Sequence, residues 1–267
     1  MPVRCLRLIR LGLHFLRGFL VLTFRYPRLS RDMKSEVARN WSRKFLTALA
    51  LELRVSGHVP NGQAENTLLV SNHVSWLDII ALASCTPPRF VAKQEIRSWP
   101  LIGWMVNRGG TLFIDRSNRR DASRVNQVMA NALTEGDCLC VFPEGTTTNG
   151  HVLLPFKSSL FESAVLAHST VLPVALRYVD ELGQLTSAPA YAGNTTFWQS
   201  LGRLLRLRRI IVEVHFGAPL TAGHEPLLTR FELAEAARHD IATQLSLSPD
   251  RPDTAMQTAS DPQAAAQ

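Results

Sequence analysis

Residues 67–83 read TLLVSNHVSWLDIIALA, and the expected architecture starts from this segment. Its first five residues form a short, largely apolar run, which predicts a buried strand over 67–71. Ser75, followed three residues later by Asp78, is typical of a helix start with Ser75 as the N-cap, and a helix is expected over 77–83. A strand that turns directly into a helix is the opening of a βαβ unit.

The same alternation continues along the chain. Further apolar runs predict strands at 89–92, 111–114, 138–142, 171–177 and 210–216, and helices are expected at 121–135 and 158–168. Several of these runs are continuous rather than alternating, as in strands covered on both faces. We therefore predict an α/β fold over 58–245, with a mostly parallel sheet flanked by helices. The tail at 246–267 is dominated by Ser, Pro, Asp, Ala and Gln and is expected to be disordered.

The N-terminal segment differs from the rest in its charge. The chain carries a net charge of +7, and residues 1–57 hold twelve basic against three acidic residues, while the remainder is nearly neutral. Within 6–24, basic side chains fall on one arc of a helix and apolar side chains on the other. The basic arc comprises Arg7, Arg10, His14 and Arg17, with Arg4 ahead of the segment and Arg25 and Arg28 behind it, and the apolar side comprises Leu8, Leu11, Phe15, Phe19 and Leu22.

This segregation favours a helix that lies in the plane of a membrane surface. A spanning helix would carry its arginines through hydrocarbon, at about 2.5–3.5 kcal/mol for each central Arg. A helix in the interface avoids that cost and gains from anionic head groups. With a second helix expected over 35–53, residues 1–57 are predicted to form a membrane-associated helical hairpin around Tyr26-Pro27. The alternative is that both helices simply pack on the domain. Nucleic acid is not expected as a partner, since no binding module accompanies the basic end.

The four cysteines have neither disulfide-framework nor zinc-type spacing, so a reducing, cytosol-facing compartment and no metal site are expected.

The residues expected to carry out the chemistry are His73 and Asp78. Across a strand-to-helix turn, Asp78 can accept one imidazole N–H of His73 and leave the other ring nitrogen as a general base. This is the His–Asp half of a catalytic triad, with a substrate hydroxyl in place of the serine.

Two further blocks place polar groups at the carboxyl ends of expected strands. Residues 109–116, GGTLFIDR, end in Arg116, whose guanidinium suits an anionic oxygen. Residues 142–147, FPEGTT, supply Glu144, Gly145 and Thr146. Glycine permits close approach of the backbone to a ligand, and threonine supplies hydroxyl and amide donors. Taken singly, the arginine could be a surface ion-pair residue and the second block only a turn.

Four blocks taken in order resemble the glycerolipid acyltransferases typified by 1-acyl-glycerol-3-phosphate acyltransferase. The blocks are Asn72-His73 with Asp78, Phe113 to Arg116, Phe142 to Thr146, and Leu172-Pro173-Val174, within residues 68–178. The resemblance implies His73 as base, Asp78 as its orienting partner, and Arg116, Glu144, Gly145 and Thr146 as residues that shape the acceptor site. Lys93 and Lys157 are further basic candidates near the head group.

The resemblance also implies the reaction. A fatty acyl group moves from acyl-CoA or acyl carrier protein to the free hydroxyl of 1-acyl-glycerol-3-phosphate, giving phosphatidic acid without a metal or organic cofactor. Family members that act on lysophosphatidic acid often carry Arg after Glu-Gly-Thr, whereas this chain has Thr147. A different lysolipid acceptor, such as lyso-ornithine lipid, therefore stays open. The expected location is the cytoplasmic face of the inner membrane. A hydrolase and a non-catalytic lipid-binding protein are the alternatives, and the first lacks a Gly-x-Ser-x-Gly elbow.

Overall fold

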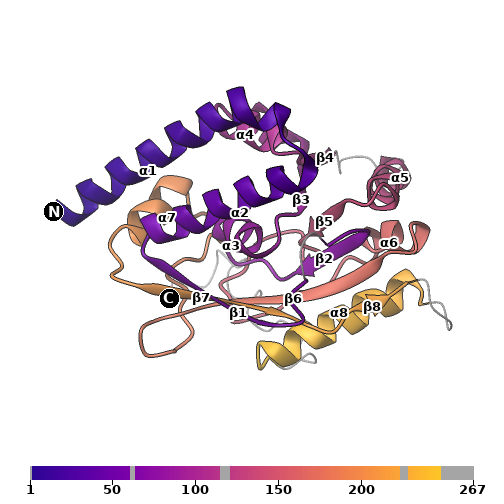
Figure 1. Ribbon diagram of the computed structural model, residues 1–267. Coiled ribbons are helices and arrows are strands. Elements are labelled where there is room, and N and C mark those ends of the chain that lie inside the picture. Colours follow the sequence, from indigo (N-terminus) through magenta and orange to yellow (C-terminus); the bar gives the residue numbers. More distant parts are fainter. Residues whose placement is uncertain (1, 61–63, 115–120, 223–227, 248–267) are drawn as a thin grey trace, which may run out of the picture.

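The computed structural model describes residues 2–60, 64–114, 121–222 and 228–247. One mixed sheet runs through the molecule with helices on both faces (Figure 1). Its strands lie in the order β1-β7-β6-β2-β5-β3-β4, and β8 pairs with β6. Their bounds are β1 (Leu51–Gly57), β2 (Thr67–Ser71), β3 (Arg89–Lys93), β4 (Leu112–Ile114), β5 (Cys138–Val141), β6 (Thr170–Val179), β7 (Ile210–Phe216) and β8 (Leu220–Thr221).

The central strands run parallel. Strand β2 pairs in parallel with β5 and β6, β3 with β4 and β5, and β1 with β7, while β7 and β8 are antiparallel to β6. Strands β2 and β5 are buried along their whole length, which explains their uninterrupted apolar sequences. The predicted α/β class with a mostly parallel sheet is confirmed.

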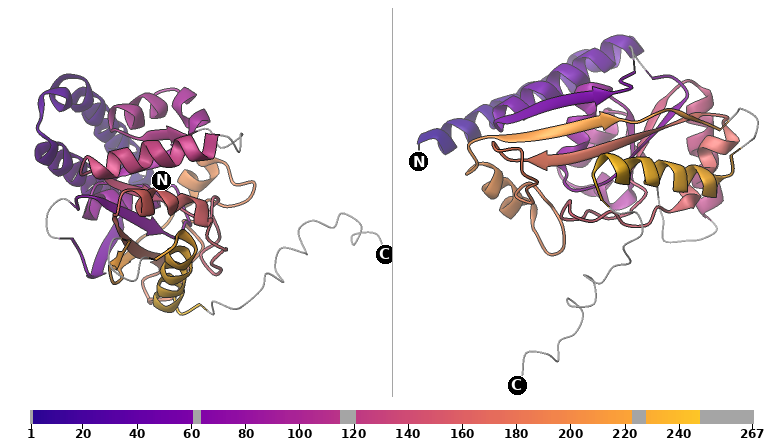
Figure 2. Two further views of the ribbon diagram at one scale, coloured as in Figure 1. Left: turned by 90° about the vertical axis from the view of Figure 1, so that its right-hand side faces the viewer. Right: turned by 90° about the horizontal axis from the view of Figure 1, so that it is seen from below.

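Different sets of helices pack on the two faces of the sheet. Alternate residues of the central strands supply two separate apolar cores, one shared with α1, α2, α3 and α7 and the other with α5, α6 and α8. Figure 2 shows α8 running along β6 on the face opposite α2 and α3. The helix bounds are α1 (Pro2–Leu20), α2 (Arg31–Ala48), α3 (Leu77–Cys85), α4 (Ile102–Arg108), α5 (Asp121–Thr134), α6 (Glu162–Leu166), α7 (Phe197–Leu204) and α8 (Arg230–Gln244).

The second N-terminal helix begins and ends earlier than predicted. The expected helix over 35–53 ends at Ala48, and Ala50 adopts a positive φ of 59° that breaks the helix. Residues 51–57, which the prediction placed in the N-terminal hairpin, form the edge strand β1 of the sheet. Their alternation of Leu51, Leu53 and Val55 with polar residues has the period of a strand, and pairing with β7 outweighs the local helix preference.

The apolar side of α1 packs largely on the protein, as in the alternative in which both N-terminal helices pack on the domain. Leu11 is buried, Phe15 packs edge-on against Phe45 of α2, and Phe19 lies against Trp104 of α4. These side chains belong to the row that was expected to face the membrane. From the expected basic arc, Arg7 instead donates to the carbonyl of Leu207 (2.6 Å). The hairpin needs an apolar packing face of its own, and this row supplies it.

A different apolar row on α1 and the turn after it faces the solvent. It lies about a quarter of a turn or more away from the packed row. We call these six side chains the outer row: Leu6, Ile9, Leu13, Leu16, Leu20 and Phe24, which are 46–64% exposed. The exposed arginines Arg10 and Arg17 lie beside this row on the helix. Among the described residues, no helix is both long and apolar enough to cross a membrane.

Candidate active site

The site lies where β2 ends and the chain turns into α3. Asn72 closes the strand: its side-chain amide donates to the carbonyl of Leu176, and its side-chain carbonyl accepts from the amide of Leu176, both at 2.8 Å. These two hydrogen bonds extend the pairing between β2 and β6 beyond Ser71, the last paired residue of β2. The next residue, His73, is thereby held just beyond the carboxyl edge of the sheet, where ligands bind in parallel α/β sheets.

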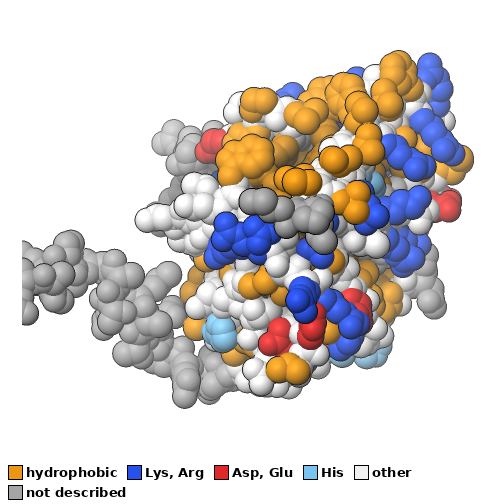
Figure 3. All heavy atoms as spheres, turned by 90° about the vertical axis from the view of Figure 1, so that its left-hand side faces the viewer, with side chains coloured by type: hydrophobic (Ala, Val, Ile, Leu, Met, Phe, Trp, Pro, Cys, Tyr) orange, Lys and Arg blue, Asp and Glu red, His pale blue; other side chains and the backbone are white. Residues whose placement is uncertain are grey.

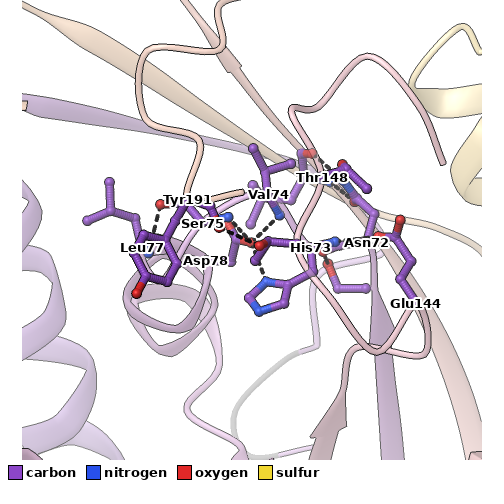
Figure 4. Close-up of polar contacts among 12 residues, drawn as sticks. Asn72, His73, Val74, Ser75, Leu77, Asp78, Glu144, Thr148 and Tyr191 are labelled. Atoms are coloured by element: carbon purple, nitrogen blue, oxygen red, sulfur yellow. Dashed lines mark hydrogen bonds and ion pairs between the residues drawn. The ribbon is translucent and has the colours of Figure 1, made fainter. Parts of the chain in front are cut away.

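The backbone of His73 is held on both sides. Its N–H donates to Glu144 Oε1 (2.7 Å), and its carbonyl accepts from the amide of Thr148 (2.8 Å) (Figure 4). The imidazole stacks on Phe142, with ring centroids 3.9 Å apart and planes inclined by 14°. The main chain and the ring plane of His73 are therefore fixed before any ligand binds.

The imidazole meets Asp78 across the turn. His73 Nδ1 donates to Asp78 Oδ2 at 2.7 Å, because an ionised carboxylate only accepts hydrogen bonds. In the neutral ring Nε2 then carries no proton and is available as a base, and the imidazole is 19% exposed. The structure thus brings together the two residues that the sequence singled out, in the geometry that a general base requires.

The carboxylate of Asp78 is completely buried and fully hydrogen-bonded. Besides the imidazole, Oδ2 accepts from the amides of Val74 (2.7 Å) and Ser75 (2.9 Å), and Oδ1 accepts from the hydroxyl of Tyr178 (2.7 Å). Four donors explain how a charge is accommodated away from water. Ser75 is not the N-cap residue: α3 begins one residue later than a Ser75 cap implies, and Ser75 Oγ accepts from the amide of Leu77.

Glu144 supports this loop from the neighbouring strand end. Its side chain is buried, and its two oxygens accept from the amides of His73 (2.7 Å) and Leu154 (3.0 Å). Burial raises the pKa of the Glu144 carboxyl to about 7, while the two backbone hydrogen bonds act in the opposite direction. Both oxygens are therefore committed to holding the backbone around His73.

The raised pKa of Glu144 predicts a measurable pH effect on stability. The folded chain binds more protons at this site than the unfolded chain between pH 4.5 and pH 7, so the contribution to stability is complete below that range and is lost as the pH rises through it. The loss should amount to about 3 kcal/mol in wild type and should be absent from Glu144→Gln. Denaturant unfolding at pH 5 and pH 7.5 tests this. If the free energy of unfolding changes equally with pH in the wild type and in the variant, the raised pKa of Glu144 is refuted.

The other expected residues take different positions. Gly145 has a φ of +76°, and the Lys157 ammonium lies so close that a Cβ on Gly145 would clash with Nζ. Thr146 and Lys157 are exposed, and Lys93 is exposed at the end of β3. Arg116 lies outside the described residues. Of the acceptor-site candidates, the structure thus brings Gly145 and Lys157 into contact beside Glu144.

Sequence reasoning missed two supporting residues. Phe142 was quoted only as part of a block, yet its ring supports the imidazole of His73. Tyr178 marked only the end of the stretch that resembles the acyltransferases, yet its hydroxyl reaches Asp78 from β6. A polar hydroxyl near the carboxyl end of a buried strand was the available signal, because a buried Tyr hydroxyl needs a partner.

A mostly parallel α/β sheet that presents a hydrogen-bonded histidine–aspartate pair beyond its carboxyl edge has the arrangement with which an enzyme can activate a hydroxyl group. Residues 52–177 match the family model described as Acyltransferase. A 1-acyl-sn-glycerol-3-phosphate acyltransferase of Neisseria meningitidis is 42% identical over 65% of this chain and 68% of its own length. A lyso-ornithine lipid O-acyltransferase of Pseudomonas aeruginosa is 38% identical over 91% of each chain.

The fold is similar to the crystal structure of the 1-acyl-sn-glycerophosphate acyltransferase of Thermotoga maritima. The TM-score is 0.64 at 21% identity, and the match covers 92% of this chain and 99% of the other. The chain therefore belongs to the acyltransferase family that contains these lysophosphatidic acid and lyso-ornithine lipid enzymes, and it is an O-acyltransferase.

Proposed function

We propose that this protein transfers a fatty acyl group from acyl-CoA or acyl carrier protein to the free hydroxyl of 1-acyl-glycerol-3-phosphate, giving phosphatidic acid. The contact between His73 Nδ1 and the buried Asp78 carries the proposal. In the reaction, His73 Nε2 takes the proton from the acceptor hydroxyl as its oxygen attacks the thioester carbonyl. The new C–O bond forms, the C–S bond breaks, and the sulfur leaves as a thiolate that can take up the proton held by His73. No acyl-enzyme, metal or organic cofactor is required.

The cation beside Gly145 supports an anionic head group on the acceptor. The Lys157 ammonium lies over a glycine whose lack of a side chain leaves the backbone open, close to the loop that carries His73. A phosphate placed there would meet a positive charge and backbone amides, which is a common way for proteins to bind anions. Lys157 can thus supply part of the charge that an arginine at position 147 would have given.

A second acceptor is favoured by two observations. Thr147 offers no cation, and its hydroxyl is already engaged with the carbonyl of Tyr191. The similarity to a lyso-ornithine lipid O-acyltransferase also extends over 91% of both chains. Lyso-ornithine lipid is therefore the alternative acceptor, with the same chemistry at His73.

Parallel assays distinguish the two acceptors. Purified protein in detergent micelles would receive labelled acyl-CoA or acyl carrier protein with either lysophosphatidic acid or lyso-ornithine lipid. Phosphatidic acid as the favoured product is the expected result. If product forms only from lyso-ornithine lipid, that lipid is the acceptor and lysophosphatidic acid is not. Lipid binding without any transfer would support the non-catalytic alternative.

The outer row of α1 supports an anionic membrane surface as partner, and the proposed location is the cytoplasmic face of the inner membrane. Figure 3 shows hydrophobic side chains gathered on one end of the molecule with Lys and Arg side chains next to them. Exposed leucines flanked by Arg10 and Arg17 are the composition expected of a helix that lies in the head-group region. A lysolipid acceptor could then enter from the bilayer while the water-soluble donor arrives from the cytosol.

Charges placed in the outer row should weaken membrane binding. The double variant Leu13→Glu/Leu16→Glu should bind vesicles of phosphatidylglycerol and phosphatidylcholine at least roughly tenfold less tightly, because burial of each leucine is worth about 1.5–3 kcal/mol. Leu182→Glu is the matched control, since Leu182 is 82% exposed but lies in the turn after β6 and not on α1. Sedimentation with vesicles gives the measurement. Equal binding by the double variant and wild type would rule out this surface.

A further inference from the structure

Tyr178 lies beside the His73–Asp78 pair although it is a hundred residues away in sequence. Strand β6 pairs in parallel with β2 up to Ser71, opposite Val174, and then continues past the end of β2. The residues that follow Val174 on β6 therefore lie level with the loop that carries His73. Tyr178 is one of them, is 1% exposed, and its hydroxyl donates to Asp78 Oδ1 at 2.7 Å.

The two carboxylate oxygens of Asp78 accept hydrogen bonds from different donors. Oδ2 receives the imidazole Nδ1 and the amides of Val74 and Ser75, whereas Oδ1 receives the hydroxyl of Tyr178. The terminal torsion of an Asp side chain is broad, so the rotation of the carboxylate is set by its hydrogen bonds. The Tyr178 bond opposes rotation of Oδ2 away from His73. It also draws negative charge toward Oδ1, away from the imidazole.

We propose that Tyr178 is a positioning residue of the acyl-transfer site, whose hydroxyl orients the Asp78 carboxylate and limits the negative charge that His73 experiences. The role rests on the proposed functions of His73 and Asp78. A purely structural role is the competing explanation, because a buried tyrosine hydroxyl needs some partner in any case. Only the positioning role predicts a change in how His73 titrates.

Tyr178→Phe should slow transfer at pH 7 by roughly five- to twentyfold, and part of the loss should be recovered at higher pH. Without the phenolic donor, the undiminished charge of Asp78 favours the imidazolium form of His73. The acidic limb of the rate profile should therefore move to higher pH, by roughly half to one unit. The variant keeps the ring and removes one oxygen, so the apolar core around position 178 is preserved.

The deciding experiment follows the His73 imidazole by NMR in histidine-labelled protein, with its resonance assigned by its absence from His73→Ala. In Tyr178→Phe the titration midpoint of His73 should rise relative to wild type. Ser163→Ala is the matched control: it deletes a buried hydroxyl that, among the residues the structure describes, donates to the carbonyl of Leu160 in its own segment. It should leave the His73 midpoint unchanged.

A folded Tyr178→Phe variant with an unchanged midpoint would overturn the proposal. If that variant does not fold, 3-fluorotyrosine incorporated at the three tyrosines gives the second test. Its more acidic hydroxyl is a stronger donor, so the His73 midpoint should fall, and an unmoved midpoint would again overturn the role. The titration does not depend on turnover. A wild type without transferase activity would therefore refute the proposed function, while the midpoints would still decide the role of Tyr178.

Discussion

His73→Ala is expected to reduce acyl transfer by roughly 10²–10⁴-fold, the range that a positioned general base contributes. The alanine removes Nε2 but keeps the backbone bonds to Glu144 and Thr148 that hold the loop. Initial rates with labelled thioester and lysolipid, together with thermal unfolding, give the measurement.

His239→Ala is the matched control, because His239 is exposed on α8, whereas His73 lies in the loop after β2. It should retain wild-type activity. A folded His73→Ala variant that works within a few-fold of wild type would remove His73 from the mechanism.

Asp78→Asn is expected to cost roughly 10²-fold or more in rate with little change in fold. The asparagine oxygen can still accept from the amides of Val74 and Ser75, and its NH₂ group can donate to the Tyr178 hydroxyl. What is lost is the negative charge that stabilises the imidazolium as the proton is transferred. The acidic limb of the rate profile should accordingly move to lower pH, opposite to the shift expected for Tyr178→Phe.

Rate–pH profiles of the wild type, Asp78→Asn and Tyr178→Phe provide the measurement. Shifts in opposite directions would mean that charge at Asp78, and not only packing, controls His73. Profiles that fall in height without moving would contradict the electrostatic part of the account for both residues.

The central sheet could be predicted because its strands carry their own signal. Runs such as 67–71 and 210–216 are apolar and bounded by polar or turn residues, and β2 and β7 have these same bounds in the structure. Strand β1 escaped prediction because its Leu, Glu and Arg residues also suit a helix, and only pairing with β7 selects the extended form.

The meeting of His73 with Asp78 could be predicted for a similar reason, since both residues lie in one local turn. The contact between Tyr178 and Asp78 could not be predicted, because it depends on the register between β2 and β6, which no local pattern specifies. The packed face of α1 could not be assigned from the sequence because the helix has two apolar rows. Which of them is buried depends on the aromatic residues of α2 and α4.

Product analysis in a single turnover tests the central claim most directly. Wild type and His73→Ala would each be mixed in micelles with an acyl-labelled thioester, with and without lysolipid acceptor. We predict that the label appears in the acylated lipid only when wild type and acceptor are both present, with one thiol released for each ester formed. Label released as free fatty acid at the same rate with or without acceptor, or transfer that survives in His73→Ala, would contradict direct acyl transfer by His73.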